Sequence, residues 1–122
     1  MAMNMPAKDL TPLQGMLLTS LDLHGTTGVT NLQPLARMPL TYLNLTSLPI
    51  SDLTALQGMT SLQNADLKQT RVTDASLAQL QDCKNLTKLT LTGTKVTAAG
   101  VGELQRALPK CKIGWDGASE PK

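Results

Sequence analysis

The chain has 122 residues, of which 41% are hydrophobic and 16% charged, a balance typical of one globular domain rather than a disordered or membrane-spanning chain. A formal net charge of +2 is too small to indicate a nucleic-acid-binding protein, and no apolar run is long enough to cross a membrane. Residues 1–10 lack the basic and apolar regions of a signal peptide, so we expect a cytoplasmic protein.

The first feature along the chain is a duplicated word. The residues DLTPLQGM at 9–16 recur as DLTALQGM at 52–59, which indicates an internal repeat. The second copy follows a predicted strand and the first does not. Residues 9–17 are therefore expected to be the second half of a repeat, so that the chain opens in mid-unit. Aligned on the first leucine of each unit, the repeats begin at Leu18, Leu40, Leu62 and Leu86.

Each repeat opens with the pattern LxxLxL, or a variant with alanine, in which apolar and polar residues alternate as in a strand with one buried face. A fifth strand is predicted 22 residues after Leu86, where LPKCKI from Leu108 matches LTKLTL and turns Cys111 and Ile113 inward. In the first four strands, the inward positions are Leu21 and Leu23, Leu43 and Leu45, Ala65 and Leu67, and Leu89 and Leu91.

The segments that return to the next strand are of two kinds. In the first two repeats they are too short for more than a turn or two of helix. In the third and fourth, apolar residues at helical spacing predict short α-helices, with Thr73 or Asp74, and Thr97, as their N-caps. The apolar positions of these helices are Leu77 and Leu80, and Val101, Leu104 and Leu108.

The pattern LxxLxLxxT, followed by a valine and a leucine pair, resembles the leucine-rich repeat family from about Leu10 to Trp115. More narrowly, MPLTYLNLTSLPISDL, LTGTKVTAAGV and LPKCKIGWDG resemble repeats of bacterial leucine-rich repeat proteins, including tails of serine/threonine protein kinases in planctomycete-type bacteria. The resemblance implies an α/β fold: a right-handed solenoid with a parallel β-sheet on its concave face and short helices and turns on its convex face. It would span residues 1–117, with a C-terminal capping strand at 108–115 and a flexible tail at 118–122.

The sequence departs from the family's usual pattern after each strand. The position normally held by an asparagine, which bonds successive turns, carries Thr26, Leu48, Thr70 and Thr94. A threonine hydroxyl can still bond a neighbouring backbone group, whereas a leucine cannot. The turn after the second strand is therefore expected to be looser, or to be satisfied in another way.

The resemblance also places a binding surface on the concave face. Asp22 and His24 share that face, with Tyr42 and Asn44 one strand away, and they form the best candidate recognition patch. The alternative is a strand face that is merely solvated. The predicted binding residues are Asp22, His24, Tyr42, Asn44, Asn64, Asp66, Lys68 and Lys88.

A basic strip is a second candidate on the same face, toward its C-terminal end. Four lysines without interleaved aromatic residues are a weak signal for nucleic acid, so a solvated or protein-facing charge patch is the favoured interpretation. The strip consists of Lys68, Lys88, Lys110 and Lys112.

The sequence contains few residues in patterns that would support catalysis or cofactor binding. His24 with Asp22 falls short of the three or four ligands of a zinc site, so no metal is expected. Cys83 and Cys111 occupy apolar repeat positions, which predicts buried free thiols rather than nucleophiles. No phosphate-binding loop pattern occurs, so no nucleotide cofactor is expected. A hydrolase or metal site near Asp22 and His24 is the least favoured hypothesis.

The sequence thus predicts a non-catalytic protein-protein interaction module, without cofactor, nucleic-acid or membrane partner, that could belong to a larger signalling protein. The main alternative is a structural role in which the poorly capped N-terminal end pairs with a second copy in a homodimer.

Overall fold

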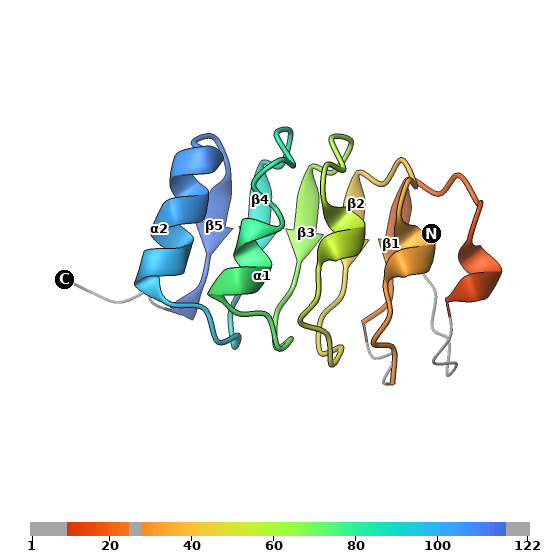
Figure 1. The fold of residues 1–122 in the computed structure, drawn as a ribbon, viewed down its shortest axis with the longest axis horizontal. Helices are drawn as coiled ribbons and strands as arrows, with labels where there is room; N and C mark the ends of the chain where they lie inside the picture. Colours follow the sequence, from red (N-terminus) through yellow and green to blue (C-terminus); the bar gives the residue numbers. More distant parts are fainter. Residues whose placement is uncertain (1–9, 25–27, 117–122) are drawn as a thin grey trace.

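The computed structural model describes residues 10–24 and 28–116. Over these residues five strands form one parallel sheet in the order β1-β2-β3-β4-β5, so each strand pairs with the next in sequence (Figure 1). The strands are three residues long: β1 Ser20–Asp22, β2 Tyr42–Asn44, β3 Asn64–Asp66, β4 Lys88–Thr90 and β5 Lys112–Gly114. This is the parallel sheet that the repeats predict.

The return segments form a second layer beside the sheet (Figure 1). They are the 3-10 helices η1 Thr11–Leu13, η2 Gln33–Leu35 and η3 Thr54–Leu56, followed by the α-helices α1 Asp74–Ala78 and α2 Ala98–Ala107. Paired strands are 22 residues apart where a 3-10 turn joins them and 24 apart where an α-helix does. Among the described residues, no helix is both long and apolar enough to span a membrane.

The duplicated word has one backbone conformation in both copies, as far as the structure describes the first. In each, a leucine amide donates to the carbonyl three residues earlier, from Leu13 to Leu10 at 2.8 Å and from Leu56 to Leu53 at 2.9 Å. The glycine of each copy has a positive φ, 87° in the first and 71° in the second. The described part of the first copy therefore has the backbone conformation of a return segment. That residues 9–17 are half of a repeat stays a prediction.

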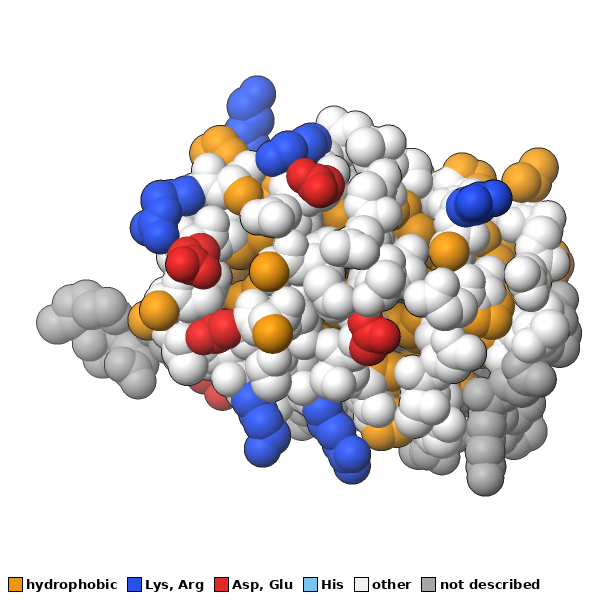
Figure 2. Space-filling model, in the orientation of Figure 1, with side chains coloured by type: hydrophobic (Ala, Val, Ile, Leu, Met, Phe, Trp, Pro, Cys, Tyr) orange, Lys and Arg blue, Asp and Glu red, His pale blue; other side chains and the backbone are white. Residues whose placement is uncertain are grey.

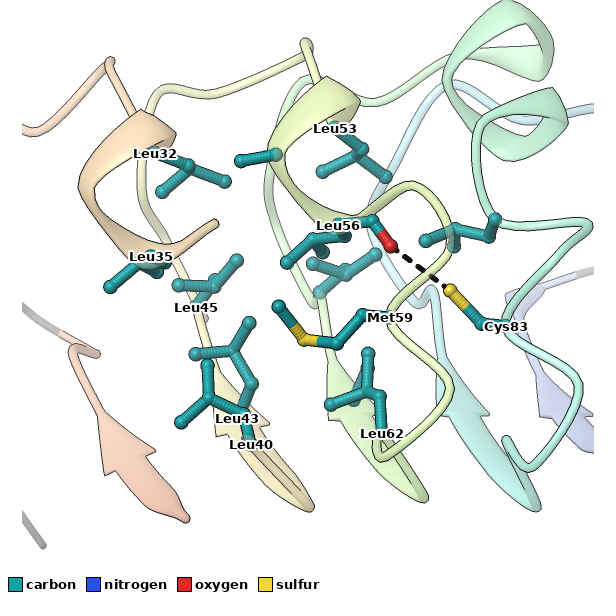
Figure 3. Packing of buried hydrophobic residues seen from close by; sticks show 14 of the residues in the cluster. Leu32, Leu35, Leu40, Leu43, Leu45, Leu53, Leu56, Met59, Leu62 and Cys83 are labelled. Atoms are coloured by element: carbon teal, nitrogen blue, oxygen red, sulfur yellow. Dashed lines mark hydrogen bonds between the residues drawn. The ribbon is translucent and has the colours of Figure 1, made fainter. Parts of the chain in front are cut away.

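The core lies between the two layers as a ladder of aliphatic side chains. All inward positions predicted for the first four strands are at most 1% exposed. Figure 3 shows Leu53 and Leu56 of one repeat and Leu32 and Leu35 of the repeat before it. They lie among buried side chains that include Leu43 of β2 and Leu45 directly after this strand. Full burial of each such side chain contributes roughly 1.5–3 kcal/mol, and stacking neighbours supply much of that burial.

The fifth strand is displaced from its predicted position. Lys112, and not Lys110, pairs with Lys88, so β5 begins two residues later than the match of LPKCKI with LTKLTL predicts. The reason is the length of α2. Leu108 is the C-cap of this helix and its amide donates to the carbonyl of Leu104 at 2.8 Å, so it closes the return segment instead of opening a strand.

Three residues of the predicted capping segment lie against the core. Cys111 is only 4% exposed, and Ile113 and Trp115 are half-buried against the core. The strand β5 lies within the predicted capping segment 108–115. The predicted tail at 118–122 lies outside the described residues.

The turns after the strands are more uniform than predicted. Thr70 and Thr94 donate their hydroxyls to the carbonyl three residues earlier at 2.8 and 2.7 Å, as expected. The amide of Leu48 donates to the equivalent carbonyl at 3.2 Å, and the amides of Thr70 and Thr94 do so at 3.3 and 3.2 Å. The turn after β2 is therefore not looser; it is satisfied by the backbone bond and by burial of the leucine side chain. Thr26 lies outside the described residues.

The two α-helices are joined at their N-termini. Thr73 and Thr97 are the N-caps. One carboxylate oxygen of Asp74, the first residue of α1, accepts the Thr97 amide at 2.8 Å, and the other accepts the Thr97 hydroxyl at 2.5 Å. These hydrogen bonds, the hydroxyl first, hold the pKa of Asp74 below its ordinary value.

Candidate binding surface

The outward side chains of the five strands, together with the residue two positions after each of the first four, form a surface that we call the strand face. Because the strands are parallel and in register, equivalent residues of successive repeats stack in rows that cross the strands. Neighbouring residues within a row are about 4.8 Å apart, the spacing of adjacent strands. Row one contains Ser20, Tyr42, Asn64, Lys88 and Lys112; row two contains Asp22, Asn44, Asp66, Thr90 and Gly114; row three contains His24, Thr46, Lys68 and Thr92.

All eight predicted binding residues lie on the strand face. Tyr42, Asn64 and Lys88 belong to row one, in which Tyr42 stands directly between Ser20 and Asn64. The backbone ladder continues past the strands into row three, where the Ser47 amide donates to the carbonyl of Lys68 at 2.9 Å. The structure therefore brings the predicted residues onto one continuous surface, and their role in binding stays a prediction.

Three residues of row two also form turns at the ends of the strands, a structural role that was not predicted from the sequence. Asp22, Asn44 and Asp66 each accept, through one side-chain oxygen, the backbone amide two residues later, at 3.0, 3.0 and 3.1 Å. Such turns are a known preference of Asp and Asn, and the recurrence of these residues at the last strand position was a readable signal. Row two therefore ends the strands as well as facing solvent.

The pair of Asp22 and His24 belongs to this turn. The Nδ1 atom of His24 lies 2.7 Å from the carboxylate oxygen that also accepts the His24 amide. Burial raises the pKa of Asp22, but the hydrogen bonds from His24 and its charge together outweigh that effect, so the pKa is lowered. Within the described parts of the chain, no three His, Cys, Asp or Glu side chains gather at a metal-binding distance. The geometry of the pair is that of a strand-ending turn.

The predicted basic strip is only partly correct. Lys68 is paired with Asp66 across 3.6 Å. Lys110 lies in the turn between α2 and β5 and is absent from the rows of the strand face, which corrects its predicted place. Of the four lysines in the predicted strip, Lys88 and Lys112 remain as a pair. They are neighbours in row one, on the adjacent strands β4 and β5.

Both cysteines are buried free thiols, as predicted. The Cys83 sulfur donates to the carbonyl of Leu56 at 3.2 Å, so it ties the third repeat to the second (Figure 3). Burial raises the pKa of Cys83, and it raises that of Cys111 to about 11. A thiol that is protonated and buried at neutral pH is a poor nucleophile, so the cysteines have a packing role.

The face that carries the helices has a mixed surface, on which acidic and basic side chains are scattered among neutral ones (Figure 2). An open hollow of about 410 Å³ near the start of α1 has Arg71 and Lys95 on its border, together with Asp52. The Asp52 carboxylate is already used, because it accepts hydrogen bonds from Thr54 and Gln79. This hollow therefore offers a weaker candidate than the strand face.

Comparison with known proteins identifies the fold. No protein-family model and no curated protein matches the sequence. Among solved structures, an internalin C2 from Listeria monocytogenes matches with a TM-score of 0.78 and 27% identity, over 88% of this chain and 46% of that one. An internalin (InlF) from the same organism matches with a TM-score of 0.78 and 23% identity, over 93% of this chain and 33% of that one. Internalins are leucine-rich repeat proteins. This chain has the leucine-rich repeat fold.

The predicted α/β leucine-rich repeat solenoid is thereby confirmed. The chain spans less than half the length of either internalin, at 46% and 33%. The narrower resemblance to repeats attached to bacterial kinases stays a prediction.

Proposed function

We propose that this leucine-rich repeat protein is a non-catalytic module that binds a protein partner through its strand face. The observation that carries the proposal is the arrangement of the rows: five parallel strands present polar side chains of successive repeats on one continuous surface. Repeat solenoids characteristically use such extended surfaces for binding.

Tyr42 is the side chain on this surface best suited to anchor a partner. It is the only tyrosine of the chain, and it is half-buried in row one beside the small Ser20 and the polar Asn64. Tyrosine is enriched among residues that dominate binding energies, because its ring offers a large contact area and its hydroxyl a hydrogen bond.

The titratable groups of the strand face support binding rather than catalysis. The Asp22 carboxylate is engaged by His24 and the Asp66 carboxylate by Lys68. A general acid needs a proton to donate at the reacting atom, and the carboxyl of Asp22, whose pKa is lowered, is ionised at neutral pH. The Asp22 oxygen that could accept a proton as a general base already accepts the hydrogen bond of the His24 amide.

The proposal is tested by the double variant Tyr42→Ala with Asp22→Asn. Asparagine keeps the side-chain oxygen that ends β1, so thermal stability should change little while the charge and the aromatic ring are lost. Capture of native partners by the immobilised protein should weaken about tenfold or more, measured by quantitative mass spectrometry.

The matched control is Gln57→Ala with Gln81→Ala, two exposed residues of the return segments. The control should retain its captured proteins. Equal capture by this variant and the control would exclude the part of the strand face around Tyr42 and Asp22 as the binding surface.

Self-association is the second candidate, favoured by one observation near the N-terminal half repeat. Leu17 is 82% exposed and Met16 is 40% exposed, although Leu10 and Leu13 nearby are buried. An exposed leucine of this kind could be covered by a second copy. Sedimentation velocity over a concentration series distinguishes the two, since a monomer at every concentration would eliminate this alternative.

A further inference from the structure

The charges of the strand face are unevenly compensated. In its first three repeats, each carboxylate has a cationic or hydrogen-bonding neighbour on the same face. Asp22 lies 2.7 Å from the ring nitrogen of His24, and Asp66 lies 3.6 Å from the ammonium of Lys68. The carboxylates in this part of the strand face are therefore engaged by neighbouring side chains.

Lys88 and Lys112 differ, because the sheet register places them directly opposite each other on β4 and β5. Adjacent strands are about 4.8 Å apart, and like charges at opposed positions destabilise a sheet. Both side chains are exposed, and the ion pairs found in the described residues include neither of them. Their row-two neighbours, Thr90 and Gly114, carry no charge.

The surface beside these lysines is open to a partner. A Cβ atom built on Gly114 would meet no atom within 4 Å, and Thr92, two residues after the adjacent strand β4, is exposed. The carboxylate that follows β5, Asp116, accepts the amide of Gly93 at 3.1 Å and thus takes part in the turn after β4. A partner segment can therefore approach the two ammonium groups closely.

We propose that the protein partner presents an acidic segment to Lys88 and Lys112. The inference rests on the proposed function and adds the chemistry of the partner. Carboxylates between the two lysines would offset their mutual repulsion, whereas a basic segment would increase it. A single-stranded nucleic acid is less well matched, because stacking of its bases needs aromatic side chains and Tyr42 lies on β2, two strands away from Lys88.

The experiment uses an octaglutamate peptide as the probe, titrated into the ¹⁵N-labelled full chain at low ionic strength, where charge interactions are least screened. Amide shifts are expected at residues 88–92 and 112–114 and not around Tyr42. Lys88→Glu with Lys112→Glu should weaken binding about tenfold or more, because attraction becomes repulsion. Lys88→Arg with Lys112→Arg should retain binding.

The matched control is Lys84→Glu with Lys95→Glu, which makes the same change in net charge at exposed positions off the strand face. It should bind the peptide nearly as the unmodified chain does. Absence of binding, shifts spread over the whole surface, or equal weakening by the control would overturn the proposal. Tighter binding of octauridylate RNA through Lys88 and Lys112 would overturn it in favour of nucleic acid.

A second measurement separates this inference from the proposed function. Native proteins captured in the earlier experiment should be lost by Lys88→Glu with Lys112→Glu, and their acidic character can then be examined. If these proteins are lost only by the Tyr42 and Asp22 variant, the strand face still binds protein and the acidic-segment proposal fails. If neither variant loses them, both proposals fail.

Discussion

At the scale of single residues, equivalent turns of the repeats show where a residue with a Cβ atom has the left-handed backbone conformation that favours glycine. Three described non-glycine residues have positive φ: Arg37 at 71°, Ser47 at 68° and Gln69 at 58°. Arg37 follows η2 at the place where Gly15 follows η1 and Gly58 follows η3. A left-handed conformation costs a residue with a Cβ atom about 1–2 kcal/mol, so equivalent turns differ in strain although their hydrogen bonds agree.

We predict that Arg37→Gly stabilises the protein by about 0.5–1 kcal/mol, because relief of the left-handed conformation exceeds the entropy that glycine adds to the unfolded chain. Urea unfolding followed by circular dichroism measures the change. The control is Gly58→Ala, where an added Cβ meets nothing within 4 Å, so that its loss of stability reports on φ alone. A less stable Arg37→Gly would show that the arginine side chain contributes more than its backbone costs.

At the scale of elements, most of the fold could be predicted because the relevant signals are local. Alternation at period two decides which strand residues are buried, and the spacing of Leu77 and Leu80 indicated a helix in the third repeat. The start of β5 does not depend on a local signal. LPKCKI matches an earlier strand in its spacing, but whether Leu108 opens a strand or closes α2 depends on the length of the helix packed beneath it.

The candidate surface was predictable to the same extent. Membership of the strand face follows from alternation, so Tyr42 and Asn64 were placed correctly. Which atoms are already engaged does not follow, because the turn that uses Asp22 and the pairing of Asp66 with Lys68 depend on side-chain geometry. The uncompensated state of Lys112 appears only in the register.

The junction of the two α-helices gives a prediction at this scale. A Cβ atom on Gly100 would lie 2.2 Å from an oxygen and 2.8 Å from the Cβ of Asp74, the residue that holds Thr97. Gly100→Ala should therefore destabilise the protein by about 1–3 kcal/mol, as overpacking does. Gly102→Ala in the same helix is the control, since its nearest atom lies 4.0 Å away on Arg106, and it should be neutral or stabilising. Similar unfolding midpoints for the two variants would contradict this account of the junction.

At the scale of the whole molecule, one hydrophobic cluster runs from Leu10 in the half repeat to Cys111 beside β5. Each repeat buries its leucines largely against its neighbours, so its stability depends on those neighbours being folded. Cys83 adds to this coupling by donating to the carbonyl of Leu56 in the repeat before it. A short solenoid of this kind is expected to unfold as one unit, because a repeat separated from its neighbours would expose much of its core.

The single tryptophan makes that expectation testable, because Trp115 lies at the C-terminal end against the core while circular dichroism reports on all repeats. Ile113→Ala removes a half-buried side chain beside it and should destabilise the chain by about 1–2 kcal/mol. If the repeats are coupled, tryptophan fluorescence and circular dichroism shift together in urea, whereas the exposed Lys112→Ala shifts neither. Loss of the Trp115 signal before the circular dichroism signal would mean that the last repeat unfolds by itself. In that case Lys112 would leave the strand face while Tyr42 remained on it, so the same measurement determines whether the two ends of the strand face can act on a partner together.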